Sequence, residues 1–80
     1  MMNHPQIPSI TILMEEAIQI AWDYLERTDE IDDPEVCSQI LLHAVESMLR
    51  QGLSSRLLLS NRAISWYQRY KANRDIKAAS

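Results

Sequence analysis

The chain has few of the residues that give small domains extra stability or chemistry. It contains one cysteine, Cys37, so an intrachain disulfide is excluded, and a lone thiol is typical of a reducing compartment. Its one glycine, Gly52, excludes a glycine-rich phosphate loop. Residues 1–9 lack basic side chains, and Glu15 and Glu16 cut the first apolar stretch, so the sequence predicts neither a membrane span nor a secretory signal. We expect a cytoplasmic protein.

Residues that bind metals or perform catalysis are also scarce. His4, Cys37 and His43 lack the spacing of a zinc site. The acidic stretch 29–33 would place Pro34 where a calcium loop requires glycine. Cys37 is expected on the apolar side of a helix, away from His43, and therefore in the core. We predict no metal, no cofactor, no catalytic residue and no enzymatic activity.

Apolar side chains at helical spacing are abundant. Hydrophobic residues make up 46% of the 80 positions, and no alternating strand pattern is present. These features predict an all-α fold, a single domain over residues 1–80 that forms a small three-helix bundle with short turns. We expect an extended lead-in over residues 1–9, where Pro5 and Pro8 disfavour helix, then helices over 12–27, 34–51 and 55–72 and a frayed tail over 73–80.

The second helix has the clearest boundary signals. Asp33 followed by Pro34 is typical of an N-cap with proline at the first helical position. Asp32 is an alternative cap, because it would form a capping box with Glu35. Gly52 is placed to end the helix in a left-handed conformation.

The sequence leaves two possible starts for the third helix. Ser54 or Ser55 could cap a helix that runs on without interruption. Ser60 and Asn61 leave the alternative of a break, with the last helix starting there.

Charge is distributed unevenly along the chain. Residues 1–35 contain nine acids and one base, whereas residues 36–80 contain seven bases and two acids, which together give the net charge of −3. This asymmetry predicts that the two halves attract each other, within one fold or across a dimer. A polyanion bound to the basic half is the alternative.

The apolar faces of the three helices are broad. They span about 200°, 200° and 180° of the helical circumference, whereas one-sided packing needs an arc of only a little over 100°. The excess predicts association, most simply as a homodimer, because large exposed apolar patches mark interaction sites. The candidate interface residues are Trp22, Leu58, Trp66, Tyr67 and Tyr70.

These features favour a non-enzymatic helical module that binds itself or another protein. The alternative is a DNA-binding regulator that resembles a helix-turn-helix, because a glycine-containing turn precedes a basic helix. Its candidate contacts would be Arg56, Arg62, Arg69, Lys71 and Arg74. A small-molecule site beside Trp22 or Trp66 is a third, weaker hypothesis, and no ligand can be inferred. The chain is also similar to small helical proteins that are common in bacterial genomes.

Overall fold

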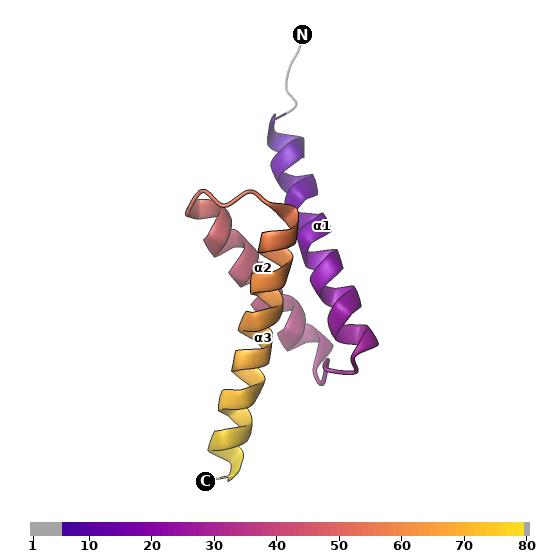
Figure 1. Cartoon of the computed structure of the whole chain (residues 1–80), viewed down its shortest axis with the longest axis vertical. Helices are drawn as coiled ribbons and strands as arrows, with labels where there is room; N and C mark the ends of the chain where they lie inside the picture. The colour runs from indigo at the N-terminus through magenta and orange to yellow at the C-terminus, as the bar shows by residue number, and fades with distance from the viewer. Residues whose placement is uncertain (1–5, 80) are drawn as a thin grey trace.

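The computed structural model describes the backbone of residues 6–79 and the side chains of residues 10–75. It contains three helices, α1 (Gln6–Arg27), α2 (Pro34–Arg50) and α3 (Arg56–Ala79), and no strand within the described range. Helices α1 and α3 run in the same direction, and α2 crosses behind them in the opposite direction (Figure 1). The prediction of an all-α three-helix bundle is confirmed.

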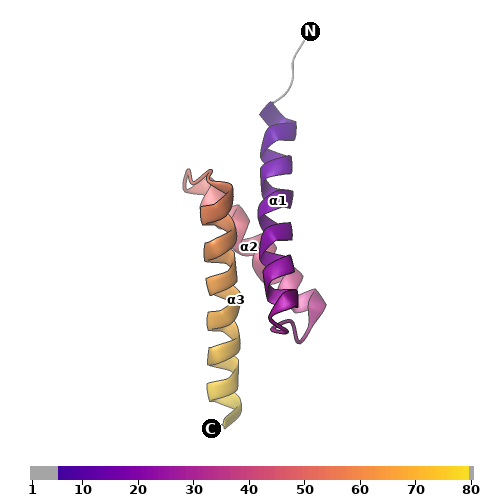
Figure 2. The same ribbon diagram turned by 45° about the vertical axis from the view of Figure 1, so that its right-hand side comes forward.

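The first turns of α1 and the last turns of α3 project beyond opposite ends of the bundle. Figure 2 shows that the start of α1 extends past the α2–α3 connection, while the end of α3 extends past the α1–α2 connection. Helix α3 contacts both other helices.

Helix α1 begins at Gln6, so the predicted lead-in over residues 1–9 is wrong for residues 6–9. Pro8 is the third residue of the helix. The first four N–H groups of a helix have no partner within it, so a proline there removes no hydrogen bond. Residues 1–5 of the predicted lead-in, including Pro5, lie outside the described range.

Helix α3 is continuous from Arg56, so the alternative of a break at Ser60 is wrong. The Ser55 hydroxyl accepts a hydrogen bond from the Leu58 N–H at 3.3 Å and caps the helix. Ser60 is buried, and its hydroxyl donates to the Leu57 carbonyl at 2.9 Å, so the side chain is satisfied without breaking the helix.

The predicted frayed tail over residues 73–80 is also wrong for residues 73–79, because α3 ends at Ala79. Lysine and alanine, which favour helix, make up most of the last turn. In addition, Arg74 bonds to the α1–α2 loop, as described below, and so fixes this part of α3. Ser80 lies outside the described residues.

Helix α2 starts where the sequence predicts. Asp33 is the N-cap, and its carboxylate accepts from the N–H groups of Glu35 at 3.1 Å and Val36 at 3.3 Å. Pro34 occupies the first helical position. Since Asp33 is the cap, the neighbouring carboxylate of Asp32 is free for other contacts.

Helices α1 and α2 end in the same left-handed closure. Gly52 has a φ of 94°, its N–H donates to Leu49, and the N–H of Leu53 reaches back to Met48 at 3.1 Å. At the end of α1, Asp29 takes the glycine position with a φ of 59°. Aspartate tolerates this conformation better than most residues, but its presence gave no clear sequence signal.

The core lies where the three helices meet. Small side chains at its centre let the helices approach closely, and larger ones fill the remaining space. The buried apolar residues are Ala17, Ala21, Leu25, Cys37, Leu41, Ala44, Val45, Met48, Leu59, Ala63 and Tyr67.

Candidate interaction surface

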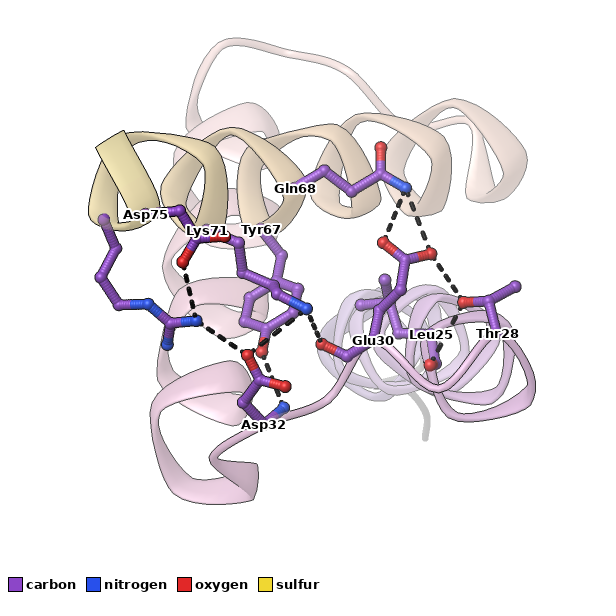
Figure 3. Close-up of polar contacts among 9 residues, drawn as sticks. Leu25, Thr28, Glu30, Asp32, Tyr67, Gln68, Lys71 and Asp75 are labelled. Carbon is purple, nitrogen blue, oxygen red and sulfur yellow. Dashed lines mark hydrogen bonds and ion pairs between the residues drawn. The ribbon is translucent and has the colours of Figure 1, made fainter. Parts of the chain in front are cut away.

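The α1–α2 loop is held against α3 by a polar cluster, which we call the clamp. It joins Glu30 and Asp32 of the loop to four α3 side chains, which are Tyr67, Gln68, Lys71 and Arg74 (Figure 3). The four α3 residues follow at helical spacing and therefore share one face.

At the Asp32 side of the clamp, Arg74 donates to the carboxylate at 2.8 Å, and the Lys71 ammonium lies 3.4 Å from the same oxygen. The Asp32 backbone N–H donates to the Tyr67 phenol oxygen at 3.3 Å. The hydrogen bond from Arg74 is the main reason why the pKa of Asp32 is lowered. Desolvation opposes this effect, and the positive charge of Lys71 adds to the lowering.

At the Glu30 side, Lys71 donates to the backbone carbonyl at 2.8 Å, so its ammonium bridges Glu30 and Asp32. The Glu30 carboxylate accepts from Thr28 at 2.6 Å and from Gln68 at 3.2 Å. These contacts add to the backbone hydrogen bonds of the turn and to the packing of Ile31 against the core.

The ion pairs of the clamp join the acidic first half of the chain to the basic second half. Within the described residues, every ion pair between different elements joins an acid of the first half to a base of the second half. The pair outside the clamp is Arg56 with Glu16, at 2.9 Å, which joins the start of α3 to α1. The halves therefore attract each other within one fold, as the sequence predicts.

The five predicted DNA-contact residues fall into two groups. Arg56, Lys71 and Arg74 bind carboxylates of the same chain. Arg62 and Arg69 form no ion pair among the residues that the structure describes, and both are exposed. The structure therefore does not bring the five together as one basic surface.

Arg62 and Arg69 line an open groove of about 350 Å³ on the outer side of α3, together with Ser65 and Trp66. The Trp66 side chain is 36% exposed, and its ring lies 5.8 Å from that of His43 on α2. We call these four lining residues the basic groove. An exposed indole between two guanidinium groups is suited to an acidic partner.

A second cavity, of about 190 Å³, lies where α1 meets the start of α2. It is lined by Trp22, Glu26, Asp29, Ile31 and Pro34, and we call it the acidic pocket. Glu26 and Asp29 form no ion pair within the described part of the chain. Two carboxylates beside an indole are suited to a cationic side chain.

The predicted interface residues have different environments. Tyr67 is only 1% exposed and belongs to the core, so its assignment to an exposed interface is corrected. Its ring is large enough to fill the space between the helices, and its hydroxyl reaches the loop. Trp66 and Tyr70 are each 36% exposed, while Trp22 and Leu58 are half-buried.

Apolar side chains outside the core remain accessible in several places. Leu57, Ile10 and Ile12 are the most exposed, at 66%, 57% and 51%. The other large apolar residues with substantial exposure are Tyr24, Leu42, Trp66 and Tyr70. The exposure of Leu57 could not be predicted from the sequence, because its position in the broad apolar arc of α3 does not distinguish it from core residues.

Cys37 is buried, and desolvation raises the pKa of its thiol to about 11, against a smaller opposing effect of the charge of Lys71. The thiolate is therefore scarce at neutral pH. Among the described residues, no three His, Cys, Asp or Glu side chains are grouped so that they could hold a metal ion. No helix in the same range has the length and apolar character needed to cross a membrane.

Comparison with known proteins assigns no family to the chain. Neither a family model, nor a curated protein, nor a solved structure matches the chain.

Proposed function

We propose that the protein is a small helical interaction module that associates with itself through exposed parts of α1 and α3. The observation that carries the proposal is the set of seven large apolar side chains that stay between 36% and 66% exposed although the core is closed. Water contact with these side chains is unfavourable, and covering them on a partner would gain free energy.

The size of the surface is compatible with this function. A standard interface takes about 800 Å² from each partner, about one-seventh of the 5485 Å² that one copy exposes. Six of the seven exposed apolar residues lie on α1 and α3, the two helices to which we assign the interface.

Light scattering coupled to size exclusion at micromolar concentration tests the proposal. We expect a mass of twice one chain that falls toward that of one chain on dilution. Leu57→Glu and Trp66→Glu each place a charge on exposed apolar surface, and we expect at least one of them to weaken association. A single-chain mass at all concentrations would remove the homodimer.

DNA binding through the basic groove is a second candidate function. Its support is that Arg62 and Arg69 are exposed and unpaired within the described range. Two arginines neutralise few phosphates, and the net charge of −3 opposes a polyanion. A mobility shift at about 50 mM salt that is lost in Arg62→Glu plus Arg69→Glu would support this candidate, and no shift at that salt concentration would end it.

A further inference from the structure

The acidic pocket and the basic groove are complementary in charge and similar in construction. Each contains a partly exposed indole, Trp22 or Trp66, beside two charged side chains that form no ion pair among the described residues. The charges are carboxylates in the pocket and guanidinium groups in the groove. Each surface therefore offers the chemistry that the other lacks.

The two surfaces lie at the same height along the bundle. Helices α1 and α3 run side by side in one direction (Figures 1 and 2). Two contacts fix their alignment, because Glu16 pairs with Arg56, 40 positions later, and Glu30 accepts from Lys71, 41 positions later. By the same offset, Arg69 lies level with Asp29.

Both surfaces border α2. Pro34, the first residue of α2, lines the acidic pocket, and His43, in the middle of α2, contacts Trp66 of the basic groove. A two-fold axis parallel to the helices keeps heights unchanged, so it brings the groove of each copy level with the pocket of the other. A contact formed by one such pair of surfaces is then formed identically by the second pair.

We propose, on the basis of the self-association proposed above, that a second copy of this chain occupies these surfaces. Arg69 of each copy enters the acidic pocket of the other, where its guanidinium stacks on Trp22 and bonds to Glu26 and Asp29. The pocket volume of about 190 Å³ suits one long side chain rather than a helix. Salt should weaken the dimer, because the contact depends on charge.

A charge exchange between two variants of the full chain tests the pairing. The first variant is Arg69→Glu, and the second is Glu26→Arg with Asp29→Asn, which keeps a residue that tolerates the left-handed backbone at position 29. Each variant alone opposes like charges at both contacts, and we expect its dissociation constant to rise about tenfold or more. An equimolar mixture restores opposite charges at both contacts, and we expect heterodimers.

Arg27→Glu and Glu15→Arg are matched controls, because they change exposed residues of α1 outside both surfaces. We expect Arg27→Glu to dimerise normally and Glu15→Arg not to rescue Arg69→Glu. Circular dichroism checks that each variant is helical, and sedimentation gives the masses. A wild-type monomer would overturn the proposed function and this pairing together. If the wild type is a dimer and Arg69→Glu remains one, or if Leu57→Glu is the only variant that dissociates it, the pairing is overturned while the proposed function stands.

Discussion

The α3 residues of the clamp and those of the basic groove are of the same kinds, with cationic side chains beside an aromatic ring. They differ in what those side chains contact. In the clamp, Lys71 and Arg74 bind Asp32, and Tyr67 is buried at 1% exposure. In the groove, Arg62 and Arg69 bind no carboxylate of the described chain, and Trp66 is 36% exposed.

The difference teaches that the position of a cation relative to the acids of α1 and of the loop, rather than residue type, decides which cations of α3 are paired within the chain. The acidic loop lies against one face of the helix, and the bases on that face are used within the chain. Bases on the outer side remain available to a partner. Trp66 and Tyr67 are adjacent in sequence, but successive residues of a helix point about 100° apart, so they belong to different regions.

Substitution of the two adjacent aromatic residues should give the largest contrast. We expect Tyr67→Ala to lower the free energy of unfolding by about 3–5 kcal/mol, because it opens a cavity in the core. Trp66→Ala should cost less, about 1–2 kcal/mol, because the residue is 36% exposed and its truncation opens no closed cavity. Urea denaturation measures both values, at a protein concentration low enough to avoid association.

If Tyr67→Ala does not fold, Tyr67→Phe serves instead. It keeps the ring but removes the phenol oxygen that accepts from Asp32, and we expect a loss of about 0.5–1.5 kcal/mol. Equal costs for Trp66→Ala and Tyr67→Ala would contradict the contrast between the two regions.

A smaller effect, dependent on pH, should distinguish Asp32 from an acid outside the clamp. The hydrogen bond from Arg74 holds the folded-state pKa of Asp32 below its ordinary value of 3.8, so the carboxylate stabilises the fold above that pH. This contribution is lost as pH falls through the folded-state pKa. Asp32→Asn should therefore lower Tm at pH 7, and the difference from wild type should shrink below pH 3.8.

Asp29→Asn is the matched control for Asp32→Asn. It removes the same charge from the same loop, but Asp29 forms no ion pair with the described residues, and asparagine accepts the left-handed backbone. At a protein concentration low enough to keep the chain monomeric, we expect its Tm at pH 7 to stay close to that of the wild type, because the proposed contact of Asp29 with Arg69 forms only between two copies. A drop as large as that of Asp32→Asn would show that the clamp is not what distinguishes the two acids.

Removal of the groove arginines should have the smallest effect on folding. Arg62→Gln with Arg69→Gln should leave the free energy of unfolding within about 0.5 kcal/mol of the wild type, because the exposed guanidinium groups have no described partner in the chain. Lys71→Gln with Arg74→Gln removes the same charge from the clamp, and we expect a clear loss. Denaturation of both double variants as dilute monomers tests this, and equal losses would refute it.

Much of the fold follows from local signals that act within a few residues. Asp33 with Pro34 predicts the start of α2, and Gly52 predicts its end. The start of α1 does not follow from such signals, because proline generally disfavours helix, whereas Pro8 lies in the first turn, where its missing N–H has no cost. The length of α3 was missed because Arg74 and the loop lie far apart in sequence.

The candidate surface was predicted only in part. Trp66 is 36% exposed and Trp22 is half-buried, whereas Tyr67 is buried. The position of a residue in the apolar arc of its helix could not separate them, because an arc wider than one helix–helix contact contains both core and surface positions. The acidic pocket was missed, because its carboxylates come from the end of α1 and the turn that follows.

The sequence by itself determined three helices, the caps of α2 and the attraction between an acidic first half and a basic second half. Helix periodicity, capping and net charge depend on neighbouring residues or on composition, so they can be read along the chain. Only the tertiary structure decided which charges are paired and which aromatic residues are covered. Those outcomes depend on distances between residues about 40 positions apart in sequence, such as Asp32 and Arg74. Only the packing of the helices fixes these distances.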